Sequence, residues 1–88
     1  MNTAFLLMAQ YNGAAIIPLE MVCRDYFQHL TPNEFARKAT NGRLNIPVVR
    51  IEGSAKATRG VHLVDLARWI DERHAAARKE CDQLQGRR

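Results

Sequence analysis

Residues 18–42, PLEMVCRDYFQHLTPNEFARKATNG, carry the patterns of two short helices. In the first half, apolar side chains at 19, 22, 23, 26 and 27 have the spacing of one helical face, which predicts a helix over residues 18–28. The second half opens with Thr31-Pro32-Asn33-Glu34, a Thr-x-x-Glu capping box with proline at the first helical position. That helix should end near Asn41-Gly42, since glycine commonly closes a helix. The connection of about three residues is typical of a helix-turn-helix.

The flanking segments complete the predicted fold. An apolar run from Phe5 to Tyr11, followed by Asn12-Gly13, predicts a strand that ends in a tight turn, with residues 14–17 extended. After the two helices, residues 47–51 read as a strand, 52–60 as a polar loop that ends at Gly60, and 61–63 as a return strand.

A long helix is predicted from about Leu63 onward. The sequence therefore predicts an α+β, winged helix-turn-helix fold. Its parts are an N-terminal strand, a two-helix helix-turn-helix, a β-hairpin wing and a long C-terminal helix. We expect one domain over residues 1–88, because no repeat or linker divides the chain.

Composition argues against several classes of function. A chain of 88 residues needs most of its apolar side chains for one core, so we expect no enzyme and no cofactor or small-molecule site. His29, His62 and His74 are scattered and no cysteine pair has zinc-site spacing, so no metal is expected. The longest apolar run is too short for a membrane span, and no export signal is evident. These features predict a cytoplasmic protein with reduced cysteines.

The net charge of +4 is unevenly distributed. Residues 35–60 contain six basic side chains and one acidic side chain. The net charge of this segment is therefore +5, which exceeds the +4 of the whole chain. Clustered lysine and arginine are typical of a nucleic-acid contact, because they release counterions condensed on the phosphates. A solvated face is the alternative interpretation.

The second helix has one core face and one free face. Phe35 and Ala39 point to the core, whereas the free face carries residue types that read base edges in a major groove: arginine for guanine and asparagine for adenine. Lys38, at the flank, should contact phosphate. An ordinary polar surface is the alternative. The candidate DNA contacts of this recognition helix are Thr31, Asn33, Arg37, Lys38, Thr40, Asn41 and Arg43.

The predicted hairpin adds a second set of candidate contacts. Its small side chains suit a sugar-phosphate backbone. Its hydroxyl groups can donate to phosphate oxygens, and its lysine and arginine side chains supply positive charge. A simple surface turn is the alternative. The candidate wing residues are Arg50, Ser54, Lys56, Thr58 and Arg59.

The C-terminal helix carries an apolar stripe with alternating spacings of three and four residues from Ala67 onward. This is the seam of a heptad repeat, and it extends further than a small domain can bury, so residues 67–85 are predicted to pair two chains as a homodimer. A frayed tail is the alternative. The candidate dimerisation residues are Ile70, His74, Ala77, Cys81 and Leu84.

Several segments resemble the pyocin activator proteins of PrtN type. They are TAFLLMAQY at 3–11, IPLE at 17–20, VCRDYF at 22–27, HLTP at 29–32, VRIEGS at 49–54 and DLA at 65–67. The resemblance implies a transcriptional activator of phage-tail-like bacteriocin genes. Such a protein binds promoter elements on double-stranded DNA and has RNA polymerase as a further partner. Residues 42–47 and 64–70 are also similar, more distantly, to the winged helix domains of excisionases and phage activators.

A second function from another class stays open. The chain could be a protein-interaction adaptor of a phage or bacteriocin module, with its basic face docked on an acidic protein rather than on DNA. Salt-sensitive retention on DNA separates the two, because only a phosphate-binding protein releases counterions.

Overall fold

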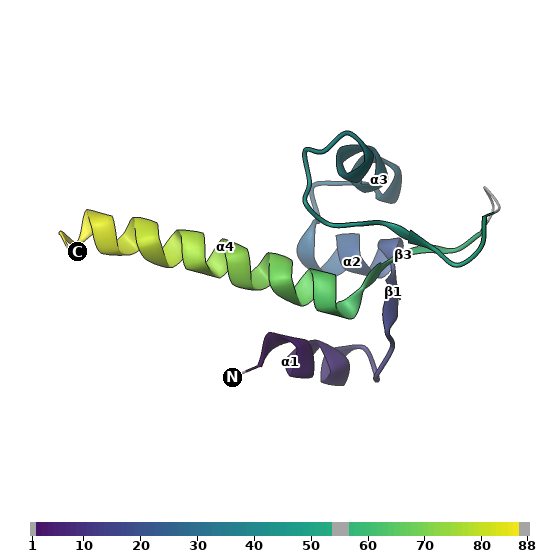
Figure 1. The fold of residues 1–88 in the computed structure, drawn as a ribbon, viewed down its shortest axis with the longest axis horizontal. Coiled ribbons are helices and arrows are strands. Elements are labelled where there is room, and N and C mark those ends of the chain that lie inside the picture. The colour runs from purple at the N-terminus through teal and green to yellow at the C-terminus, as the bar shows by residue number, and fades with distance from the viewer. Residues whose placement is uncertain (1, 54–56, 87–88) are drawn as a thin grey trace.

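The computed structural model describes residues 2–53 and 57–86. Within these ranges the fold is α+β, with four helices and a three-stranded antiparallel sheet (Figure 1). The elements follow in the order α1 Thr3–Gln10, β1 Ile16–Pro18, α2 Leu19–Tyr26, α3 Pro32–Thr40, β2 Val49–Arg50, β3 Arg59–His62 and α4 Leu63–Leu84.

The two adjacent helices predicted from residues 18–42 are confirmed. α2 begins one residue after Pro18 and ends at Tyr26, and α3 begins at Pro32. The capping box is complete: the Thr31 hydroxyl oxygen accepts from the Glu34 N–H at 3.1 Å, and Glu34 Oε1 accepts from the Thr31 N–H at 2.9 Å. Gly42 has a φ of +80° just after the helix, as the closing glycine requires.

The N-terminal strand predicted over residues 5–11 is wrong, because this segment forms α1. The Asn2 side chain caps the helix by accepting from the Phe5 N–H at 3.2 Å. Leu7 and Tyr11 are buried, whereas Phe5 stays exposed. A continuous apolar run has no period of its own, so the surface of α4 beside it selects the helix.

The Asn12-Gly13 pair has the predicted left-handed backbone but a different role. Asn12 has a φ of +54° and Gly13 a φ of +77°, and together they end α1 instead of joining two strands. The Gly13 N–H donates to the Met8 carbonyl at 2.7 Å, which closes the last turn of the helix. The chain then reverses into β1, which contains the end of the segment predicted as extended.

The sheet has the order β1-β3-β2, and both pairings are antiparallel. Ile17 is opposite Val61 and Pro18 is opposite Gly60 in one ladder, and Val49 is opposite Gly60 in the other. The return strand thus begins at Arg59, two residues earlier than predicted. Gly60 therefore belongs to the central strand and not to the loop.

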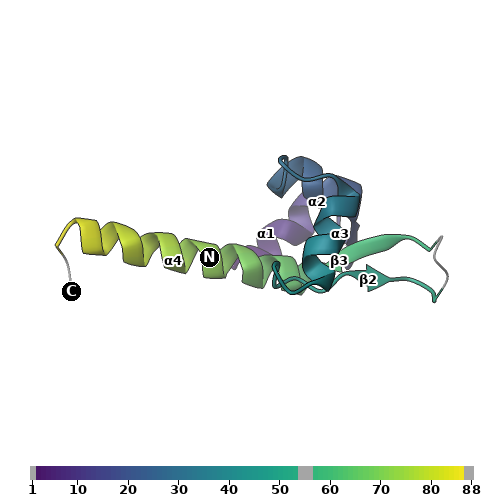
Figure 2. The ribbon, with the colours of Figure 1, turned by 90° about the horizontal axis from the view of Figure 1, so that it is seen from above.

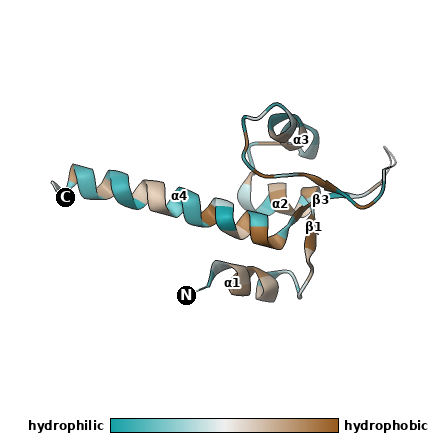
Figure 3. Ribbon diagram, viewed as in Figure 1, coloured by the Kyte–Doolittle hydropathy of each residue, from teal (hydrophilic) through white to brown (hydrophobic). Residues whose placement is uncertain are grey.

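The core lies where α1, α2, α3 and the sheet meet the start of α4. Its largest fully buried side chains are Phe35, Ile17, Ile46, Leu66, Val22 and Val61. Figure 3 shows the hydrophobic colours concentrated on the sheet and the first turns of α4, while the far part of α4 is mostly hydrophilic. Among the described residues, no buried side-chain nitrogen or oxygen lacks a hydrogen-bond partner.

α4 projects beyond the core against which its first turns pack. Its 22 residues extend about 33 Å at 1.5 Å per residue. His62 caps it, with Nδ1 accepting from the Val64 N–H at 3.1 Å. Leu66 and Ala67 are buried, whereas every side chain from Asp71 to Cys81 is exposed. The β2–β3 hairpin and the end of α4 point in opposite directions (Figure 2). No helix in residues 2–53 and 57–86 has both the length and the apolar character that a membrane crossing needs.

Asp25 links α2 to the end of α1, and this predicts an acid-sensitive contribution to stability. Arg24 donates to its carboxylate at 2.8 Å and the Tyr11 hydroxyl donates at 2.7 Å. These hydrogen bonds, that of Arg24 first, lower the Asp25 pKa from 3.8 to about 2. A lowered native pKa contributes stability that is present above the unfolded pKa and is lost as the pH falls through the native value.

We therefore expect the midpoint of urea unfolding to fall more between pH 4 and pH 2 for the unaltered chain than for Asp25→Asn, which cannot titrate. Glu72→Gln is the control, since Glu72 is exposed and has no hydrogen-bond partner among the described residues. Equal acid sensitivity in Asp25→Asn and the unaltered chain would contradict the assignment.

Candidate nucleic-acid interface

α3 presents one face to the core and one to solvent, as its sequence predicted. Phe35 is fully buried and meets Phe27 edge-on, with ring centroids 5.0 Å apart. This contact anchors α3 on α2 and orients the opposite face outward. The predicted contacts Asn33, Arg37, Thr40 and Asn41 are all exposed, and Lys38 is half-buried at the flank.

Several of the predicted contacts on α3 already have partners within the chain. The Thr31 hydroxyl belongs to the capping box, the Thr40 hydroxyl donates to the Ala36 carbonyl at 2.8 Å, and Asn41 Oδ1 accepts from the Arg43 N–H at 3.2 Å. Arg37, by contrast, has no hydrogen-bond or ion-pair partner among the described residues. Its guanidinium is therefore the donor of α3 that is most available to a ligand.

Glu34 does not neutralise Arg37 by a direct contact. The hydrogen bond from the Thr31 N–H is the main reason that the Glu34 pKa lies below its usual value. The carboxylate thus stays ionised at the helix N-terminus, where the dipole favours a negative charge. One turn later, the positive charge of Arg37 faces solvent.

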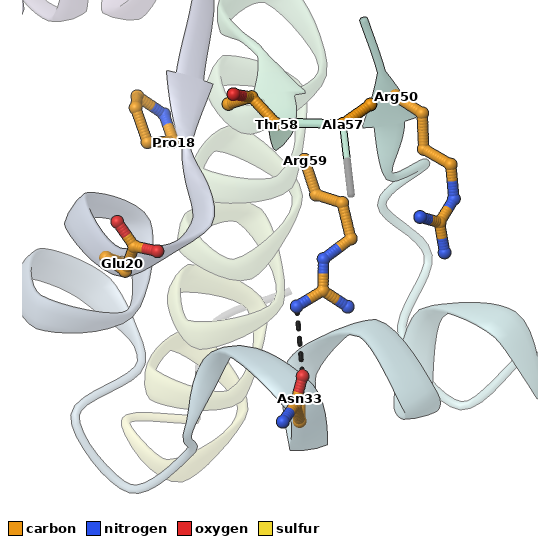
Figure 4. Close-up of a pocket in the computed structure, with 7 residues that line it drawn as sticks. All are labelled: Pro18, Glu20, Asn33, Arg50, Ala57, Thr58 and Arg59. Atoms are coloured by element: carbon orange, nitrogen blue, oxygen red, sulfur yellow. Dashed lines mark hydrogen bonds between the residues drawn. The ribbon is translucent and has the colours of Figure 1, made fainter. Parts of the chain in front are cut away.

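The hairpin contacts the start of α3 through one hydrogen bond. Arg59 Nη2 donates to Asn33 Oδ1 at 2.9 Å (Figure 4). This bond spans two elements far apart in the chain, so it holds the hairpin at a defined position beside α3. It also occupies the Asn33 acceptor, which leaves the amide NH₂ as the free donor.

A hollow of about 620 Å³ lies between the hairpin, the start of α3 and the start of α2. Figure 4 shows Arg59 pointing from β3 onto Asn33, with Arg50 on β2 beside it. The structure thus brings four of the predicted contacts together here, namely Asn33, Arg50, Thr58 and Arg59. The others on α3 and after it, Thr31, Arg37, Lys38, Thr40, Asn41 and Arg43, do not line this hollow.

Two predicted wing contacts, Ser54 and Lys56, lie outside the described residues. Sequence reasoning missed Glu20, which also lines the hollow. Its carboxylate opposes the two arginines electrostatically and would repel a phosphate at that side. Glu20 is the second residue of α2, which directly follows the edge strand β1. This position was the available signal that its side chain could lie near the hairpin.

The predicted dimerisation residues lie along α4. Ile70 is partly buried against the core, whereas His74, Ala77, Cys81 and Leu84 are exposed. Ala77, Cys81 and Leu84 line a shallow groove on the projecting part of the helix. This arrangement leaves the predicted seam accessible from His74 to Leu84. Residues 2–53 and 57–86 hold no group of three or more histidine, cysteine or acidic side chains placed to bind a metal ion.

Residues 3–77 match the family model described as pyocin activator protein PrtN. The match extends from α1 through most of α4, so the chain belongs to this family, as its sequence segments indicated. Comparison with curated proteins gives no match, and comparison with solved structures gives none either.

Proposed function

We propose that this chain is a winged helix-turn-helix protein that binds promoter elements of pyocin genes and activates their transcription. Membership of the pyocin activator family supports the regulatory role. The proposed parts are α2 and α3 as the helix-turn-helix, with α3 in the major groove, and the β2–β3 hairpin as the wing. No reaction is assigned to the chain.

The observation that carries this proposal is the placement of the basic side chains. Arg37 has no partner among residues 2–53 and 57–86 and extends from the face of α3 opposite the buried Phe35, and Arg50 and Arg59 lie on the hairpin beside the same helix. A helix that reads base edges in the major groove needs a free donor on its outer face and basic side chains beside it that contact phosphate. The Arg59–Asn33 hydrogen bond couples the two parts, so helix and hairpin would engage DNA as one rigid surface.

Titration of labelled duplexes over a salt series tests the proposal. We expect tighter binding to duplexes from upstream of pyocin genes than to scrambled duplexes. The logarithm of affinity should fall with the logarithm of salt concentration, with a slope of roughly −4 for four phosphate contacts per chain. A chain that shows no salt-sensitive retention on any duplex would not be a DNA-binding protein, and the proposal would fail.

A protein partner is the second candidate function, and the surface of α1 favours it. Phe5 is 68% exposed, Leu6 49% and Met8 47%, so α1 presents three large apolar side chains to solvent. An activator could use this face on RNA polymerase, and an adaptor could use it without DNA. Binding to polymerase that persists without DNA, together with no duplex binding, would favour the adaptor.

A further inference from the structure

α4 continues well past the domain (Figure 1), and every side chain from Asp71 to Cys81 is exposed to solvent. One stripe of this helix, which we call the seam, consists of Ile70, His74, Ala77 and Cys81. These residues alternate as the d and a positions of a heptad repeat. Charged side chains flank the seam: Arg73 and Glu80 occupy the g positions, and Asp71 and Arg78 occupy the e positions.

The flanking charges discriminate between the two ways in which a second copy can pair with this seam. In a parallel pair, a g residue faces the following e residue of the other helix, so Arg73 would meet the partner's Arg78 in both halves of the dimer. Two like-charge contacts would oppose that arrangement.

In an antiparallel pair, g faces g and e faces e. The register that places Ile70 opposite the partner's Cys81 and His74 opposite the partner's Ala77 brings Arg73 to the partner's Glu80. It also brings Asp71 to the partner's Arg78. By the two-fold symmetry each contact occurs twice, so all four flanking pairs are of opposite charge. Sliding the helices outward by one heptad would instead place Arg78 opposite the partner's Arg78 and Glu80 opposite the partner's Glu80.

We infer that the projecting part of α4 binds a second copy of this chain in the antiparallel direction and in this one register. The side chains involved can reach their partners. Arg78 now donates to Asp82 at 2.9 Å and to the Cys81 sulfur at 3.0 Å, but exposed pairs within one helix contribute little and exchange readily. Asp71 uses Oδ1 to accept from the Thr3 hydroxyl, and its second oxygen can accept from the partner.

The antiparallel pair also sets the spacing of the two domains. Its two-fold axis passes between residues 75 and 76. At 1.5 Å per residue, the first residues of the two α4 helices then lie about 38 Å apart along the pair. A dimer that reads two successive major grooves needs modules about 34 Å apart. The match between domain spacing and groove spacing rests on the proposed function. The pairing of the two helices itself needs no DNA.

Sedimentation equilibrium of the full chain without DNA tests the pairing by charge reversal. Arg73→Glu creates a Glu–Glu contact twice in the antiparallel dimer, so the dissociation constant should rise about tenfold. The double variant Arg73→Glu, Glu80→Arg exchanges the charges and should restore it. Lys79→Glu makes the same change of charge on the side of α4 opposite the seam and should have little effect.

The opposite result identifies the parallel alternative, since Arg73→Glu would then face the partner's Arg78 and tighten the dimer.

Oxidation provides a second measurement that is independent of charge. Cys23 is buried and Cys81 is exposed, so Cys81 is the accessible thiol. The two Cys81 residues would be about 16.5 Å apart along the antiparallel pair and could not form a disulfide. Ile70→Cys should instead crosslink to the partner's Cys81.

A Cys81–Cys81 disulfide within the dimer, a tighter dimer in Arg73→Glu, or a chain that stays monomeric at all concentrations would each overturn the inference. None of these results depends on DNA. A monomer that still binds duplexes would leave the proposed function standing, and a dimer that binds none would leave the pairing standing.

Discussion

Gly60→Ala is expected to lower the free energy of unfolding by about 3 kcal/mol, at the upper end of the usual cost of overpacking. A Cβ on Gly60 would lie 2.6 Å from Ile16 Cγ2 and 2.6 Å from the Ile17 carbonyl oxygen. The Ile16 side chain can rotate away, but the carbonyl belongs to the backbone of the neighbouring strand. β1 and β3 would therefore have to separate, in a sheet whose central strand is β3.

Gly53→Ala is the matched control for this prediction. Gly53 follows β2 and is exposed, and a Cβ there would meet nothing within 4 Å. Its substitution should change stability by less than about 0.5 kcal/mol. Urea unfolding followed by circular dichroism compares the two variants. If Gly60→Ala were as stable as Gly53→Ala, the close packing of β1 on β3 would be wrong.

Gly60 also illustrates what the sequence could not predict. Its composition-based assignment to a loop rested on neighbouring small polar residues, whereas its actual role comes from the backbone of β1, which is distant in the chain. Only the tertiary pairing shows that a side chain has no room there. By contrast, the start of α3 was predictable, because every contact of the capping box lies within four consecutive residues.

The prediction of an N-terminal strand was wrong for a related reason. Residues 5–9 are all apolar, so they fit a buried strand and one side of a helix equally well. The choice is made by packing: Leu7 and Tyr11, four residues apart, are buried together. Asn2 was the local signal that could have favoured the helix, since asparagine is among the best N-cap residues.

The candidate interface was predictable as a set of charges but not as a set of contacts. The excess of basic residues in 35–60 indicated which segment to consider, and periodicity showed which face of α3 is free. The hydrogen bond between Arg59 and Asn33 joins residues 26 positions apart, and no spacing rule predicts it. It changes the expected role of Asn33, because reading adenine with both amide atoms would require Arg59 to release the oxygen.

Arg37→Ala should therefore be the most informative change in the interface. We expect a loss of about 1–3 kcal/mol in binding to the cognate duplex, up to a hundredfold or so in affinity, with a much smaller loss on a scrambled duplex. The reason is that Arg37 extends from the solvent face of α3 and is unpaired within the described part of the chain, so its guanidinium can donate to guanine O6 and N7. Folding should be unaffected, since alanine favours an exposed helix.

Arg50→Ala is the matched comparison, because it removes the same side chain from β2, where a phosphate contact is expected. It should weaken cognate and scrambled duplexes alike and reduce the salt slope by about 1. Anisotropy titrations of both variants on both duplexes, over one salt series, measure the difference. Equal losses on the two duplexes for Arg37→Ala would make Arg37 another phosphate contact. Base recognition would then have to come from elsewhere than the centre of α3.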